Sequence, residues 1–138
     1  MKPGGWTLTD HFEPQEETDE PWRETITSAG QLRAELERLA ALEPRIAELE
    51  TPDGRIIRIG IGGPWGGFGV IEGLPAVLRL RIARARTSAP IARVEFLYWQ
   101  QPSSLRAEQL FPVAEAVDLV VDFFQSGRFP EWLGWDQS

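Results

Sequence analysis

A segment near the C-terminus predicts a helix that is apolar on almost every side. It begins at about Pro112 or Val113, where a proline suits the first helical turn. Its polar positions recur every three or four residues and form one stripe: Glu115, Asp118, Asp122 and Gln125. A helix with such a narrow polar stripe has to be covered over most of its surface by a sheet or by loops. Gly127 is a natural stop for it, so the rest of the chain must fold around this helix.

A second helix is predicted from Ser28 to about Leu42. Ser28 followed by Gln31 is a capping-box pattern that marks the first turn of a helix. Three leucines recur at helical spacing and predict one buried stripe: Leu32, Leu36 and Leu39. Pro44 disfavours helical backbone at the residue before it, so the helix should end near Leu42.

The middle of the chain has the pattern of antiparallel strands. Thr51-Pro52-Asp53-Gly54 is typical turn chemistry between two arms at 45–50 and 55–61. In the second arm Ile57, Ile59 and Ile61 share one face. Further strands are expected at 22–27, 68–72, 77–83 and 92–99, and a short one after the last helix. We therefore predict an α+β fold, with a mainly antiparallel sheet of about five to seven strands packed against two helices.

Length and composition predict one domain preceded by an acidic arm. A chain of 138 residues, 42% of them hydrophobic, can bury a core without a metal or a disulfide. Residues 1–21 are rich in glycine, proline and acidic residues, so we expect a flexible arm there and a single domain at 22–138. No apolar run approaches the roughly 18 residues of a membrane span, and the first residues lack the apolar core of a signal peptide. We expect a cytoplasmic protein that does not bind a membrane.

The inventory of reactive side chains disfavours several classes of enzyme. The chain has no cysteine and a single histidine, His11, which argues against thiol chemistry and zinc sites. We expect no catalysis, no bound metal and no cofactor. Chemistry based on carboxylates stays open, and the alternative is a small enzyme that uses Glu48 or Glu95 with Asp53. The net charge of −7 disfavours direct binding of nucleic acid and suits a basic protein partner.

The order of these elements resembles the Imm-one family of bacterial immunity proteins, which accompany polymorphic toxins. Members have a helix like Ser28 to Leu42, then a hairpin leading to a strand with a glycine such as Gly60. They close with a pattern like Phe123-Phe124-x-x-Gly127-x-x-Pro130-x-x-x-x-Trp135. The closing segment is also similar to that of the immunity protein that guards against a double-stranded-DNA cytosine deaminase toxin. The resemblance covers about residues 22–136.

The resemblance implies inhibition by binding, in interbacterial competition. Such a protein acts in the cytoplasm, where it neutralises a cognate secreted toxin by covering its active site or substrate groove. The toxin implied is a domain of the deaminase superfamily that acts on nucleic acid. A regulatory adaptor for another basic protein is the alternative outside this family.

The candidate toxin-binding residues fall into two groups. The first is acidic and would imitate nucleic-acid phosphate in a basic groove: Asp10, Glu13, Glu16, Glu17, Asp19 and Glu20. A solvated tail is the alternative interpretation of this group. The second is aromatic and would anchor an interface: Trp65, Phe68, Tyr98 and Trp99. The motif residues are expected to hold the fold instead: Gly60, Phe124, Gly127, Pro130 and Trp135.

One more segment carries a cluster of positive charge. Its arginines alternate with apolar residues: Arg79, Arg81, Arg84 and Arg86. The pattern places Arg79 and Arg81 on one face of a strand, where we expect them in solvent, protecting the edge of a sheet. Contact with RNA or DNA is the alternative.

Overall fold

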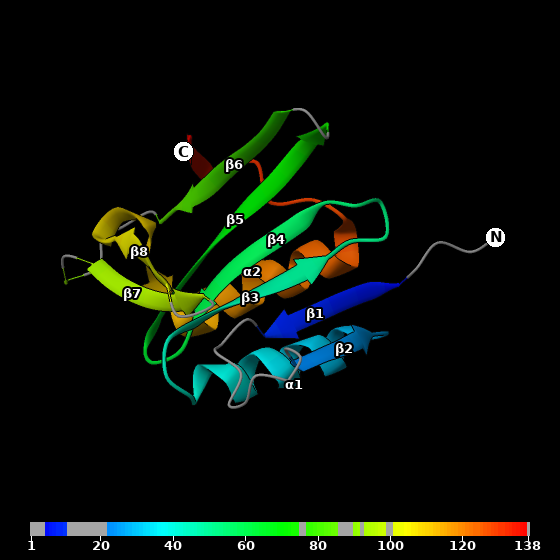
Figure 1. Cartoon of the computed structure of the whole chain (residues 1–138), viewed down its shortest axis with the longest axis horizontal. Helices are drawn as coiled ribbons and strands as arrows, with labels where there is room; N and C mark the ends of the chain where they lie inside the picture. The colour runs from blue at the N-terminus through cyan, green and yellow to red at the C-terminus, as the bar shows by residue number, and fades with distance from the viewer. Residues whose placement is uncertain are drawn as a thin grey trace.

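The protein is built on a twisted sheet, seen face-on in a computed structural model (Figure 1). The structure describes residues 5–10, 22–74, 77–85, 90–91, 93–98 and 101–137. Antiparallel pairing links the main strands in the order β10-β6-β5-β4-β3-β1-β2. Their bounds are β1 Trp6–Asp10, β2 Trp22–Ile26, β3 Arg45–Glu50, β4 Ile56–Ile61, β5 Trp65–Leu74, β6 Val77–Arg84 and β10 Gly134–Gln137.

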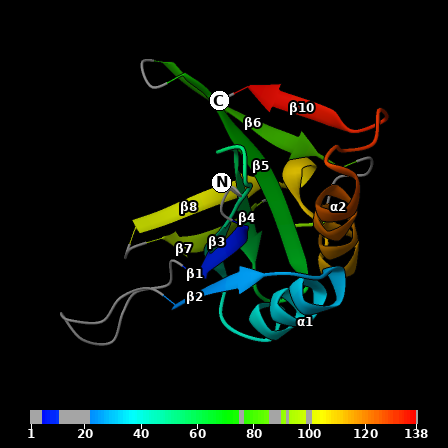
Figure 2. The same cartoon turned by 90° about the vertical axis from the view of Figure 1, so that its right-hand side faces the viewer.

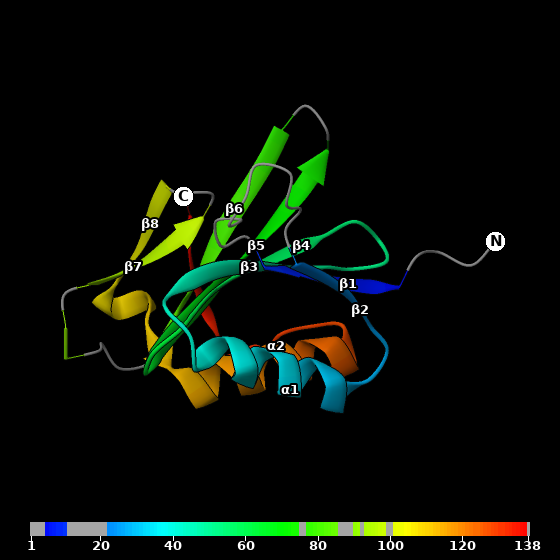
Figure 3. The ribbon, with the colours of Figure 1, turned by 60° about the horizontal axis from the view of Figure 1, so that its bottom comes forward.

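A second hairpin stands on one end of this sheet. Its strands are β7, Arg93–Tyr98, and β8, Gln101–Arg106, and it meets the main sheet through a single parallel pairing of Arg45 with Leu97. A short 3-10 helix, Ala107–Gln109, and the two-residue strand β9, Phe111–Pro112, follow it and return the chain to β5. Figures 2 and 3 place the hairpin on the side of the sheet away from the helices.

Both helices cover the same face of the sheet. α1, Ala29–Ala40, and α2, Val113–Ser126, lie side by side below the strands in Figure 3 and pack against each other. This arrangement confirms the α+β prediction with its two helices and mainly antiparallel sheet. The described residues form ten strands, because β1, β8 and β9 were not anticipated. Among the described residues, neither helix has the length and apolar character needed to cross a membrane.

Local signals account for α1. The Ser28 hydroxyl accepts a hydrogen bond from the Gln31 amide at 3.1 Å, and the Gln31 side-chain oxygen accepts one from the Thr27 amide at 2.8 Å. The first bond satisfies an amide group that a first helical turn leaves without a partner, and the second ties the residue before the cap to that turn. The predicted leucine stripe, Leu32, Leu36 and Leu39, is fully buried. The helix ends slightly before the expected Leu42, in a tight turn that precedes Pro44.

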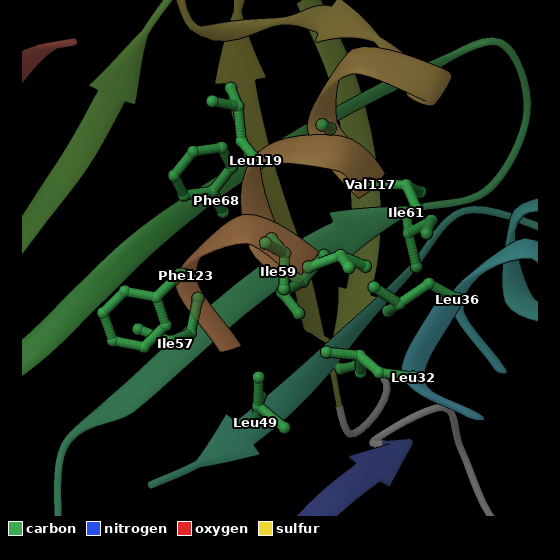
Figure 4. Close-up of a cluster of buried hydrophobic side chains, with 14 of the residues drawn as sticks. Leu32, Leu36, Leu49, Ile57, Ile59, Ile61, Phe68, Val117, Leu119 and Phe123 are labelled. Carbon is green, nitrogen blue, oxygen red and sulfur yellow. The ribbon is translucent and has the colours of Figure 1, made fainter. Parts of the chain in front are cut away.

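α2 occupies the centre of the main core. It begins at Val113, as predicted, and ends at Gly127, whose φ of 80° is the left-handed conformation that favours glycine. The Gly127 amide donates to the Phe123 carbonyl at 2.7 Å. Figure 4 shows apolar side chains from α2, α1, β3, β4 and β5 meeting between the layers: Val117, Leu119, Phe123, Leu32, Leu36, Leu49, Ile57, Ile59, Ile61 and Phe68.

The N-terminal segment is part of the sheet. The prediction of a flexible arm over residues 1–21 is wrong for Trp6–Asp10, which form β1 between β2 and β3. Leu8 enters the main core fully buried, and the Trp6 ring packs 4.8 Å from the ring of Phe124. Residues 11–21 lie outside the described part of the chain. The domain therefore includes at least one strand that composition had assigned to the arm.

Candidate functional site

Asp10 is a buried structural residue. Its Oδ2 lies 3.0 Å from Nη1 of Arg45, and the two side chains are only 11% and 8% exposed. The Arg45 Nε also donates to the Glu43 carbonyl at 2.9 Å. The prediction that Asp10 reaches a partner is therefore wrong, because burial requires its charge to be paired within the fold. The other acidic candidates lie outside the described residues: Glu13, Glu16, Glu17, Asp19 and Glu20.

The side chains of Phe68 and Trp65 are both covered by other parts of the protein, Phe68 fully and Trp65 in part. Phe68 is 1% exposed and stacks between Phe111 and Phe129, at ring distances of 5.5 Å and 5.1 Å. Its role as an interface anchor is excluded by this burial. Trp65 is half-buried against a smaller core cluster of Ile46, Phe96 and Leu110 under the β7–β8 hairpin. The backbone of Trp65 pairs with Pro112 of β9, and the role of Trp65 as an interface anchor stays a prediction.

The remaining aromatic candidates lie at the end of β7. Tyr98 closes that strand opposite Gln101, and its side chain is outside the described part of the structure. Trp99 is outside it altogether. The predicted toxin-binding residues therefore do not assemble into one surface among the residues described.

The aromatic residues of the closing motif meet at the end of α2. Phe123 stacks on Phe129 at 4.5 Å, and Phe129 meets Trp135 edge-on at 5.4 Å. Phe124 packs against Trp6. These contacts join α2 to β10 and β1 through rings rather than backbone, in the structural role expected of the motif.

Gly60, the motif glycine of β4, lies directly under the β7–β8 hairpin. A Cβ on Gly60 would lie 3.0 Å from the ring of Phe96. The absence of a side chain lets β7 sit close to the sheet. Gly60 therefore has a packing role in the fold.

The face of the sheet opposite the helices is the first candidate interface. This face is turned toward the viewer in Figure 1, and Figure 2 places the β7–β8 hairpin on the same side. Strand alternation puts three half-buried isoleucines on it: Ile56, Ile71 and Ile82. Arg58 and Glu48 form an ion pair of 3.0 Å there. A shallow cavity of about 60 Å³ lies where Ile82 and Arg58 approach Leu105 of the hairpin. We call this surface the open face.

Two of the three carboxylates of the enzyme alternative, Asp53 and Glu48, are bound to different arginines, and the third, Glu95, is exposed on β7. Asp53 accepts a hydrogen bond from the Thr51 hydroxyl, which together with Arg55 lowers the pKa of Asp53. Glu48 pairs with Arg58 on the open face. A general acid needs a raised pKa, which is the opposite of the environment of Asp53. Within the described residues, no three acidic or histidine side chains gather as metal ligands would.

A second candidate site opens beside the closing motif, on the helix side of the sheet. It is a pocket of about 220 Å³ lined by Arg55, Val70, Arg81, Phe123, Gly127, Arg128, Phe129, Pro130 and Trp135. We call it the arginine–aromatic pocket. Arg81 is half-buried and lies over Trp135, with Cζ 4.8 Å from the ring centroid, instead of standing in solvent. The edge-protection interpretation fails at Arg81, because β10 pairs with β6 from Arg81 to Arg84.

Comparison with known protein families and with curated proteins finds no match to this chain. The structural observations that bear on function are the two surfaces described above. The open face combines apolar and ion-paired residues over several strands, whereas the arginine–aromatic pocket concentrates positive charge in a small volume.

Proposed function

We propose that the chain is an immunity protein, which binds a cognate toxin domain and blocks its active site or substrate groove. The partner would be a secreted toxin of the deaminase type that acts on nucleic acid, met in the cytoplasm of the producing bacterium. The proposal rests on the resemblance carried by Gly60, Phe124, Gly127, Pro130 and Trp135. It requires no catalysis and no cofactor from this chain.

The observation that best supports binding is the one-sided cover of the sheet. Both helices lie on one face, which leaves the open face with three partly exposed isoleucines beside an ion pair. A solvated sheet face usually carries polar residues at such positions. An apolar centre with polar surroundings is the composition of protein interfaces. The open face is thus the surface on which we place the toxin.

Coexpression with the toxin domain encoded beside this chain tests the proposal. Growth rescue and a complex that survives purification are the expected results. The absence of both would refute the immunity function. A complex with a basic protein of another kind would favour the adaptor alternative instead.

A pair of charge-introducing variants tests the position of the interface. Ile71→Arg puts a charge in the centre of the open face, and we expect at least a tenfold loss of toxin affinity, which corresponds to about 1.4 kcal/mol. Glu37→Arg changes charge on the exposed side of α1 and should bind as wild type. Circular dichroism verifies that both variants fold. Equal binding by the two folded variants would exclude the open face as the interface.

A further inference from the structure

The outer edge of strand β8 lies beside the cavity on the open face. Among the residues that the structure describes, β8 pairs with β7 alone, so its opposite edge presents backbone groups that no described strand uses. Ser104 and Leu105 of β8 both line the cavity of about 60 Å³. An unpaired strand edge and a hollow in the surface therefore occur at the same place.

The register of the hairpin identifies which residues of β8 turn their backbone outward. Hydrogen-bonded and non-hydrogen-bonded pairs alternate along an antiparallel ladder, so Pro102, Ser104 and Arg106 belong to one class. The Arg106 amide donates outside the hairpin, to Oε1 of Gln109 at 3.0 Å. Pro102 has no N–H to give, which suits a position that faces away from the ladder. Ser104 therefore turns its amide and its carbonyl away from β7.

Only a short stretch of this edge can pair with another strand. Pro102 contributes a carbonyl but no donor, and the Arg106 amide is already bonded to Gln109. Ser104 lies between these two positions and is exposed. The edge is thus suited to a single β-bridge centred on Ser104 rather than to a long ladder.

The cavity beside Ser104 suits an uncharged side chain of moderate size. Most of its lining is glycine or aliphatic: Gly60, Gly67, Gly69, Ile46, Ile82 and Leu105. The charged group in this lining, Arg58, is paired with Glu48 at 3.0 Å, so the cavity does not require a charge from a ligand. One water needs about 10–15 Å³ of such space. A volume of about 60 Å³ therefore holds roughly four water-sized atoms, which is the number of carbons in a leucine or isoleucine side chain.

We propose that the β8 edge and this cavity together bind an extended segment of the toxin. The segment pairs its backbone with Ser104 and places one leucine or isoleucine side chain in the cavity. In this mode of recognition, main-chain hydrogen bonds give affinity and a pocket for one side chain gives specificity. The inference rests on the proposed function, because it names the part of the toxin that this corner of the open face would hold.

Four variants of the full chain test the proposal by their affinity for the toxin domain encoded beside it. Ser104→Pro removes the outward donor without removing a ladder bond and should weaken binding about tenfold. Ser104→Ala keeps the amide and should bind as the wild type does. Ile82→Phe fills the cavity and should also weaken binding about tenfold. Leu42→Phe is its control, because Leu42 is exposed after the end of α1, and its affinity should not change.

Hydrogen exchange of the wild-type chain gives a result that does not depend on the folding of a variant. The Ser104 amide should exchange about tenfold more slowly in the complex than in the free chain, because a hydrogen bond to the toxin protects it. Protection that instead rises with the concentration of the chain alone would identify a second copy as the occupant and would overturn the proposal.

The outcomes separate this inference from the immunity function. If the wild-type chain binds the toxin while Ser104→Pro and Ile82→Phe, both folded by circular dichroism, bind equally tightly, this inference is refuted and the immunity function stands. An unprotected Ser104 amide in the complex has the same meaning. If the wild-type chain gives neither a complex nor growth rescue, both are refuted.

Discussion

Gly67 should be among the least replaceable residues of the sheet. It lies in β5 opposite Gly60, beneath the β7–β8 hairpin. A Cβ added to Gly67 would lie 2.5 Å from Cδ1 of Leu105 and 2.6 Å from the carbonyl oxygen of Gln109. The leucine can rotate away. The carbonyl cannot, because it belongs to the backbone of the 3-10 helix. Gly67→Ala must therefore shift that backbone, and with it the hairpin.

The expected change in the free energy of unfolding of Gly67→Ala follows from two opposing effects. Overpacking a tight site costs about 1–3 kcal/mol, and a backbone contact places Gly67→Ala at the upper end of this range. Alanine also restricts the unfolded chain, which returns up to about 1 kcal/mol. We expect a net loss of about 2 kcal/mol in the free energy of unfolding. Gly30→Ala is the control, because Gly30 lies in α1 with no atom near its added Cβ. It should gain up to about 1 kcal/mol from helix propensity.

Urea denaturation followed by tryptophan fluorescence measures both changes. Trp65 packs against the cluster under the hairpin and reports on the affected region. The two variants should differ by about 3 kcal/mol in the free energy of unfolding. If Gly67→Ala proves as stable as Gly30→Ala, the hairpin is not seated on the sheet at this distance, and the reasoning is refuted.

Three further predictions concern polar contacts. Asp10→Ala removes the buried carboxylate that pairs with Arg45 and should cost about 3 kcal/mol in urea denaturation. Asp118→Ala, in a surface pair, should cost under about 1 kcal/mol, and equal losses would contradict this. Ser28→Ala removes the cap of α1 and should lower the free energy of unfolding by about 1 kcal/mol, so an unchanged midpoint would argue against the cap. The pKa of Asp53 lies below its ordinary value, so its stabilising contribution is full above the unfolded pKa near 3.9 and is lost as the pH falls through the folded pKa. Thr51→Val should raise this pKa in a carboxyl NMR titration, and an unmoved titration would exclude the hydroxyl as the cause.

The two α-helices and the central hairpin were largely predictable from local chemistry. The cap at Ser28, the stop at Gly127 and the turn at Asp53-Gly54 each depend on residues within a few positions of one another. The buried faces followed from periodicity, because side-chain direction along a strand or helix repeats regularly. Both kinds of signal can be recognised without any knowledge of which elements pack together.

The strands that escaped prediction depend on their partners. β8, Gln101–Arg106, contains Pro102 and two serines and has weak strand propensity, yet β7 supplies its hydrogen bonds along the whole length. β1 likewise pairs on both sides, and its Asp10 finds a buried arginine more than thirty positions away. The acidic composition of the segment predicted an exposed position for that residue. The prediction failed because composition does not record such a distant partner.

The chain alone determined the α+β class, the two helices, the alternation of β4 and the closing aromatic motif, since each arises from neighbouring residues. Tertiary structure decided which surfaces remain available. It buried Phe68 and Asp10, left one face of the sheet open, and brought Arg55, Arg81 and Arg128 around one pocket. Sites of this kind form where distant segments meet, and their geometry depends on how whole layers pack rather than on the spacing of residues along the chain.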